Sequence, residues 1–149
     1  ESSASVVSDG PPARQRRQRR RAGRRGRAGR GAGRAEGVAS GMAELRSVYM
    51  TFPDLDSATS VAKHLVDERM AACVNLLPRA LSVYRWEGAV RSEEEVVAFA
   101  KTTVDRVDAL VARAAELHPY QVPCVVALQP AAALPAYADW VASETTPEG

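Results

Sequence analysis

Apolar residues recur with two different periods between residues 46 and 143, and these periods predict the secondary structure. Alternation with a period of two, typical of half-buried strands, covers 46–52 and much of the longer segment 72–103. A helical period of three to four covers 55–70 and 104–117. The pattern therefore predicts a strand, a helix, a pair of strands and a second helix, in that order.

Two shorter segments complete this order. The continuous apolar run that begins at Cys124 predicts a buried strand over 124–129, and spaced apolar residues predict a last helix over 134–143. Two strand–helix–strand units with right-handed crossovers form a four-stranded antiparallel sheet with both crossover helices on one face. We therefore expect an α+β fold, a ferredoxin-like sandwich with strand order fourth, first, third, second and an extra C-terminal helix.

The segment 72–103 is predicted to be one long hairpin with its tip near Gly88. Pro78 interrupts its first arm, so this arm is an edge strand or contains a bulge there. Such a hairpin overhangs the shorter strands and carries apolar side chains that need a partner surface: Leu81, Val83, Tyr84 and Trp86. Either the third helix or another subunit covers them, and we favour a homo-oligomer closed through strand edges.

The two cysteines, Cys73 and Cys124, fall on strands at opposite edges of the predicted sheet. They cannot form a disulfide with each other within one chain. Two thiols without metal-type or redox-type spacing favour a reducing compartment, and we expect a cytoplasmic protein. No run of eighteen apolar residues is present, so we expect no membrane-spanning helix.

Charge divides the chain into two parts. Residues 1–41 carry eleven arginines and three acidic residues, a net charge of +8, whereas residues 42–149 carry nine basic and fifteen acidic residues, a net charge of −6. The first part is rich in Arg, Gly and Ala and has too little apolar surface to fold, so we expect a disordered tail. The second part has the size of one domain.

Three interpretations of this tail stay open. Arginine-rich segments neutralise phosphates, but no aromatic residue is interleaved for base stacking, which argues against nucleic-acid binding. The segment also has the composition of an organelle-targeting leader. Alternatively, the native protein starts near Met42 and the tail is not part of it.

Candidate site residues cluster in two groups. Lys101 shares a strand face with apolar residues, which is unusual for a charge, and predicts an anion-binding group in a cleft between subunits with Thr51, Tyr120 and Trp86. The alternative is an ion pair of Lys101 with Glu95 of its own or another subunit. A second group is predicted to lie at the subunit interface: Cys73, Asn75, Tyr84 and Trp86.

Several motifs resemble the CutA family of divalent-cation tolerance proteins, and the match is collinear over residues 46–143. They are Ser47–Pro53, Ala62–Val66, Met70–Pro78, Ser82–Gly88, Glu95, Lys101–Thr102, His118–Tyr120, and Tyr137 with Trp140. The resemblance implies a compact trimer of ferredoxin-like subunits, similar to the PII signal-transduction proteins. It also implies a link to copper and other divalent metals.

The resemblance also suggests metal ligands. Some bacterial members are associated with copper bound by a first-strand Cys and two His before Pro-Tyr; here these positions are Met50 and Leu117-His118. His118 and Met50 are therefore the candidate ligands for copper or another divalent ion, although a thioether suits only Cu(I) well.

Three functions follow from these observations. The first is a metal-tolerance or metal-response trimer that binds a metal or small ligand between subunits. The second is a PII-like sensor whose cleft binds a small anion and whose hairpins contact another protein, and the third is a trimer without an intrinsic ligand. Because no nucleophile–base pair or phosphate-binding glycine loop is present, we do not expect an enzyme.

Overall fold

The computed structural model describes residues 44–148, and its elements follow the predicted order. They are β1 (Leu45–Phe52), α1 (Leu55–Asp67), β2 (Cys73–Trp86), β3 (Ala89–Thr103), the 3₁₀ turn η1 (Val104–Arg106), α2 (Val107–Leu117), β4 (Val125–Leu128) and α3 (Pro135–Glu144). The strands form one antiparallel sheet in the order β2-β3-β1-β4. This is the predicted ferredoxin-like topology, and the fold prediction is confirmed. The predicted tail, 1–41, lies outside the described residues.

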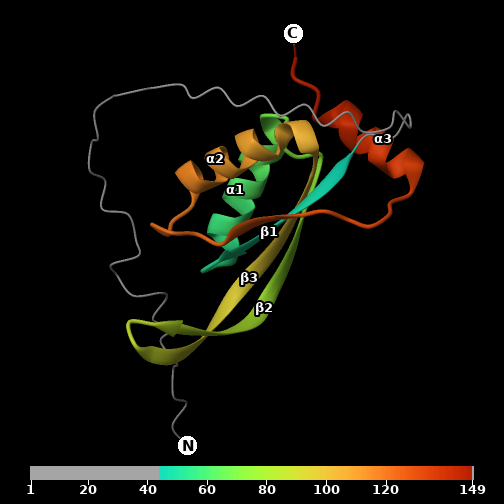
Figure 1. Cartoon of the computed structure of the whole chain (residues 1–149). Coiled ribbons are helices and arrows are strands. Elements are labelled where there is room, and N and C mark those ends of the chain that lie inside the picture. The colour runs from blue at the N-terminus through green and yellow to red at the C-terminus, as the bar shows by residue number, and fades with distance from the viewer. Residues whose placement is uncertain (1–43, 149) are drawn as a thin grey trace, which may run out of the picture.

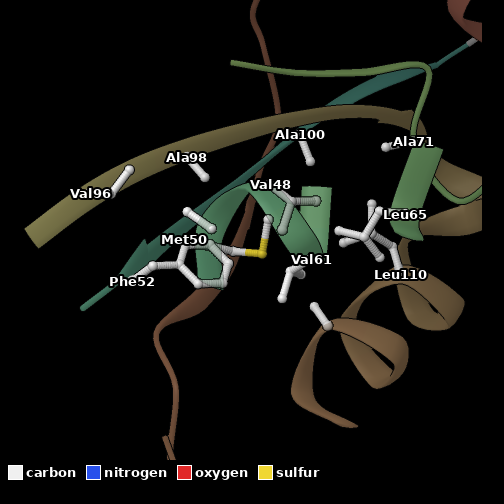
Figure 2. Close-up of a cluster of buried hydrophobic side chains, with 12 residues drawn as sticks. Val48, Met50, Phe52, Val61, Leu65, Ala71, Val96, Ala98, Ala100 and Leu110 are labelled. Atoms are coloured by element: carbon white, nitrogen blue, oxygen red, sulfur yellow. The ribbon is translucent and has the colours of Figure 1, made fainter. Parts of the chain in front are cut away.

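Helices α1 and α2 cover one face of the sheet, and the hydrophobic core lies between these two layers (Figure 1). Alternate residues of β1 point into it, and Figure 2 shows them against α1 and α2. The fully buried side chains include Val48, Met50, Phe52, Ala58, Leu65, Ala98, Ala100, Leu110 and Ala114. Alanines on β3 let the helices approach the sheet closely, since small side chains facing larger ones fill the space without voids.

The opposite face of the sheet, here called the open face, is not completely covered by the described residues, 44–148. On β1 and β3 it carries Tyr49, Thr51, Val97, Phe99 and Lys101, since these residues alternate with the core residues. Leu77, Val126 and Leu128, which share this face by strand register, are 45–48% exposed. An apolar sheet face that is about half exposed to water is typical of a surface that binds a partner.

The β2–β3 hairpin extends well past the rest of the sheet (Figure 1). Strand β3 pairs with β1 from Val96 to Thr103. Nearer the tip, the two arms of the hairpin, β2 and β3, pair only with each other. A register shift between Leu77 and Ala80, with Arg79 in a left-handed conformation (φ 64°), shows that Pro78 opens a bulge, as predicted. Glu87 and Gly88 form the two-residue turn, both with positive φ.

Helix α3 lies at the end of the sheet away from the hairpin tip (Figure 1). The Tyr137 hydroxyl lies 3.3 Å from Cys73 Sγ at the beginning of β2. Helix α3 therefore does not cover the hairpin, where Leu81, Val83 and Val90 are 64–73% exposed. The alternative that the third helix covers these side chains is therefore wrong, and cover by another subunit stays a prediction.

Two helix boundaries differ from the prediction. Helix α1 ends at Asp67 rather than at residue 70, because Arg69 takes a left-handed conformation (φ 57°). The Arg69 carbonyl accepts hydrogen bonds from the Arg106 guanidinium. The Arg69 guanidinium forms an ion pair with Glu148, with 2.9 Å between Nη2 and Oε1. The predicted helix over 104–117 begins with the separate turn η1, so regular α-helix starts at Val107.

Both thiols are free, as expected for opposite edges of the sheet. Cys73 begins edge strand β2, and Cys124 directly precedes the other edge strand, β4. Among residues 44–148, no helix is long and apolar enough to cross a membrane.

Candidate functional site

A small cavity of about 130 Å³ lies on the open-face side at the base of the hairpin. This volume corresponds to roughly four water molecules at about 30 Å³ each. Strands β1, β2 and β3 and the segment before β4 contribute its lining residues: Thr51, Tyr84, Trp86, Glu93, Glu95, Tyr120, Val122 and Cys124. The cavity therefore combines aromatic walls, two carboxylates and a thiol.

His118 supports one wall of this cavity from behind. It follows α2 directly, and the next residue, Pro119, favours its extended backbone (ψ 139°). The imidazole is only 2% exposed and stacks on Phe52 at 4.5 Å between ring centroids. Nε2 lies 2.7 Å from the Thr51 carbonyl oxygen, and the Tyr120 backbone N–H donates to Nδ1 at 3.1 Å.

These two contacts define the protonation of His118. A carbonyl only accepts and an amide N–H only donates, so Nε2 carries the hydrogen and Nδ1 carries a lone pair. The imidazole is thus neutral, and it links Thr51 to Tyr120, both of which line the cavity. His118 acts as a positioning residue.

Tyr120 donates from its hydroxyl to Glu95 Oε2 at 3.1 Å. Burial raises the pKa of this phenol well above its usual range, and the negative charges of Glu95 and Glu93 raise it further. Burial and Glu95 also raise the pKa of the Cys124 thiol. Both groups therefore stay protonated near neutral pH, which argues against either acting as a nucleophile.

The buried Trp86 indole Nε1 in the cavity wall has no hydrogen-bond partner in the described part of the chain. The Tyr84 hydroxyl is also buried. Burial raises the pKa of Tyr84, and a hydrogen bond with Glu93 and the charges of Glu93 and Glu95 raise it further. Because an indole N–H only donates, Trp86 needs an acceptor from outside the described residues.

Lys101 does not reach this cavity. Its ammonium donates to Asn75 Oδ1, and to the Phe99 carbonyl oxygen at 3.1 Å, at the end of β3 opposite to the hairpin tip. Three of the four predicted cleft residues, Thr51, Trp86 and Tyr120, thus meet in one cavity, whereas Lys101 lies elsewhere within the subunit.

Two of the predicted interface residues lie beside Lys101. Cys73 pairs with Lys101 across β2 and β3, and its thiol contacts the Tyr137 hydroxyl. The Asn75 side chain accepts a hydrogen bond from the Lys101 ammonium. Burial and the contact with Cys73 raise the pKa of Tyr137 to about 12. Cys73 and Asn75 thus mark one end of the open face, and the other two predicted interface residues, Tyr84 and Trp86, line the cavity at the opposite end.

Comparisons with known proteins agree with this fold. The sequence profile of the family described as "CutA1 divalent ion tolerance protein" matches residues 46–144. This chain is a member of the CutA1 family. The "Divalent-cation tolerance protein CutA" of Thermus thermophilus is 43% identical over 98 residues, which span 66% of this chain and 95% of that protein. The protein of the same name from Pyrococcus horikoshii is 41% identical over 98 residues, with the same coverage.

A solved CutA structure supports the same assignment. The crystal structure of CutA from Xylella fastidiosa superposes with a TM-score of 0.68 at 39% sequence identity, covering 69% of this chain and 99% of that one. The family resemblance inferred from the motifs is thus confirmed.

The copper ligands suggested by the CutA resemblance do not fit the geometry of this chain. The Met50 side chain is fully buried in the hydrophobic core (Figure 2), and both ring nitrogens of His118 are already hydrogen-bonded. Within residues 44–148, no group of three or more His, Cys, Asp or Glu side chains could hold a metal ion. A Cu(I) or Cu(II) site at His118 and Met50 would have to disrupt both the core and these hydrogen bonds.

The sequence interpretation missed the acidic side of the cavity. The sequence predicted Glu95 only as a possible ion-pair partner of Lys101 and Cys124 only as a strand residue, and it did not single out Glu93. The signal was present in the hairpin register: counting outward from the Gly88 turn places Glu93 on the same side as Tyr84 and Trp86.

Proposed function

We propose that this CutA1-family protein acts in tolerance of divalent metal ions as a homotrimer, without catalysing a reaction. The names of its relatives, divalent-cation tolerance proteins, support the role. The cavity chemistry supports a binding function, since its phenol and thiol stay protonated near neutral pH.

The observation that carries the trimer is the incompletely covered apolar surface. The open face and the hairpin together expose side chains that a monomer would leave in water: Leu77, Leu81, Val83, Val90, Val126 and Leu128. Each such side chain stabilises an interface by roughly 1–2 kcal/mol when it becomes fully buried. Three copies arranged around an axis cover this surface without leaving strand edges free.

The charge of the cavity favours a cationic ligand over the small anion of a PII-like sensor. Glu93 and Glu95 both line the cavity, and neither forms an ion pair with another described residue. An anion placed there would face two carboxylates, whereas Arg91, the cation that acts on Tyr84, is exposed and screened by solvent. We also infer a cytoplasmic location, because two free thiols persist best in a reducing compartment.

The mass of the native full-length protein, with its bound metals, tests the assembly. We expect three chains per particle, and any metal content to be the same in the wild type and in a folded His118→Asn variant. A monomer at micromolar concentration would contradict the trimer. Loss of metal in His118→Asn would contradict the positioning role of His118.

A growth experiment tests the biological role. A bacterium lacking its own CutA is complemented with this chain and exposed to elevated Cu²⁺ or Zn²⁺. We expect survival above that of the empty-vector control. Survival equal to that control, with the chain expressed and folded, would overturn the tolerance function.

A further inference from the structure

The cavity at the base of the hairpin is electrostatically incomplete. Glu95 accepts one hydrogen bond, from the neutral Tyr120 hydroxyl, and Glu93 and Glu95 are absent from the ion pairs among residues 44–148. Each is only partly exposed, so solvent screens the two charges incompletely. Arg91 lies on the same side of β3 as Glu93 and acts on Tyr84, but it is exposed to solvent, which screens its charge. Two partly buried carboxylates that form no ion pair repel each other and favour the entry of a cation.

The shape and walls of the cavity suit an organic ammonium group. About 130 Å³ admits only a few heavy atoms, and Tyr84, Trp86 and Tyr120 contribute aromatic rings, which attract cations. A bare divalent ion fits less well, since the described residues offer no cluster of three ionisable ligands. The buried Trp86 N–H has no acceptor among the described residues, so water or an incoming oxygen supplies one.

The chain itself contains two lysines, Lys63 and Lys101. Lys63 is on α1, which covers the other face of the sheet, whereas Lys101 is on the open face, as Glu95 is. Lys101 and Glu95 are six residues apart on β3, about 20 Å at the rise of a strand. A lysine side chain cannot span that distance, so Lys101 cannot enter the cavity of its own subunit.

The two ends of the open face therefore carry opposite charges. One end holds the Glu93 and Glu95 carboxylates, and the other holds the Lys101 ammonium, bonded only to the neutral acceptors Asn75 and Phe99. In a three-fold ring, each interface joins two different patches, head to tail. Opposite charges at the two ends of one face let the acidic end of each subunit meet the basic end of the next in such a ring.

We infer that the cavity of one subunit receives the Lys101 ammonium of a second copy of this chain, which makes the site composite. The incoming strand also brings backbone carbonyl groups, which supply an acceptor for the Trp86 N–H. This inference rests on the proposed trimer and identifies the group that completes its cleft.

A chemical-rescue experiment on the full-length protein tests it. Lys101→Met keeps the length and apolar stem of the side chain but removes its charge. We expect subunit association, measured by sedimentation equilibrium, to weaken at least tenfold, as for removal of one partner of a desolvated charge pair. Propylammonium at constant ionic strength then restores association by filling the cavity, and propanol does not.

Matched variants locate the effect. Glu95→Gln keeps an acceptor for Tyr120, and we expect it to abolish the rescue when combined with Lys101→Met. Glu94 lies on the opposite side of the hairpin, paired with Leu81, so Glu94→Gln leaves association and rescue unchanged. Lys63→Met controls for loss of a lysine elsewhere.

The outcomes separate this inference from the trimer itself. A trimeric wild type whose Lys101→Met variant associates equally well overturns the inference and leaves the trimer intact, whereas a monomeric wild type overturns both. Binding of propylammonium to the wild type, seen as a shift of the Trp86 indole resonance, shows a cavity open to free amines and overturns Lys101 as its occupant.

Discussion

At the scale of single residues, His118 shows how hydrogen bonds decide the role of a side chain. Its imidazole has the chemistry of a metal ligand, but the Thr51 carbonyl and the Tyr120 amide occupy its two nitrogens. Stacking on Phe52 fixes the ring between the core and the cavity wall. His118 therefore holds β1 and the segment after α2 together and orients Tyr120 toward Glu95.

The first prediction concerns this link. His118→Ala removes the stacked ring and leaves the Thr51 carbonyl and the Tyr120 N–H without partners, so we expect a loss of about 3 kcal/mol in the free energy of unfolding. Urea denaturation at a fixed protomer concentration measures it. His64→Ala, on the exposed surface of α1, is the matched control and should change stability by less than about 0.5 kcal/mol. Equal effects at both positions would contradict the role of His118.

The second prediction concerns the tyrosines at alkaline pH. The pKa of Tyr137 is raised to about 12 in the folded protein, against the ordinary 10 of an unfolded chain. Between these values the unfolded state has released its proton while the folded state keeps it, so stability falls as the pH rises from about 10 to 12. Below pH 10 the contribution is fully present.

Denaturation of Tyr137→Phe over this range provides the measurement. The variant cannot release a phenolic proton, so its stability should fall less steeply between pH 10 and 12 than that of the wild type. Tyr120→Phe should behave in the same direction, because burial also raises the pKa of Tyr120. Parallel curves for the wild type and both variants would refute the assigned shifts.

Sequence reasoning found the chemistry of the cavity only in part. Three lining residues have a visible signal in the sequence. Thr51 is a polar residue in a strand, Trp86 is an aromatic residue near a hairpin tip, and Tyr120 follows His-Pro. The sequence grouped Lys101 with them because it is a charge on an otherwise apolar strand face, but a face does not specify position along a strand. The unpaired state of Glu93 and Glu95 depends on the three-dimensional positions of all cations and could not be predicted.

At the scale of elements, the β2–β3 hairpin determines where the site is. Its bulge at Pro78 and Arg79 inserts one extra residue into β2, because the step from Leu77 to Ala80 opposes the shorter step from Val97 to Glu95 on β3. One extra residue reverses the alternation of side chains along β2, and this reversal places Tyr84 and Trp86 on the side of the open face. The turn at Glu87 and Gly88 then fixes the pairing of both arms.

The third prediction concerns this turn. Glu87 has φ 48°, a left-handed conformation that Glu adopts poorly and Asn adopts well, and Asn-Gly is the preferred pair for such turns. Glu87→Asn should therefore stabilise the protein by roughly 0.5–1 kcal/mol in thermal or urea denaturation. Glu87→Ala removes the same charge without the conformational benefit and serves as the control. Stabilisation by Ala as large as by Asn would indicate a charge effect instead.

The elements themselves followed from the sequence, but two of their ends did not. Hydrophobic alternation and helical spacing located every strand and helix from β1 to α3, because burial of one face repeats along each element. The end of α1 depends on Arg69, whose left-handed conformation is stabilised by distant Arg106 and Glu148. No local residue such as Gly or Asn marks that position, so the pattern extended the helix to residue 70.

At the scale of the whole molecule, the described residues form two layers, helices and sheet, and no third layer fully covers the open face of the sheet. Helices α1 and α2 cover one face of the sheet, and α3 covers only the end of the other face near Cys73 (Figure 1). The rest of the open face is apolar in the middle, at Leu77, Val126 and Leu128, and charged at its two ends. The proposed head-to-tail trimer buries this apolar part and pairs the charged ends.

The last prediction separates the open face from the rest of the surface. Val126 on β4 lies on the open face opposite Tyr49 and is 48% exposed, whereas Val66 on α1 is 41% exposed on the helical side. A glutamate at either position is tolerated in an isolated subunit, since both side chains reach water. If the open face forms the interface, Val126→Glu buries a charge and dissociates the trimer, whereas Val66→Glu leaves it intact. Light scattering coupled to size-exclusion chromatography distinguishes the two masses, and a trimeric Val126→Glu would place the subunit contact elsewhere.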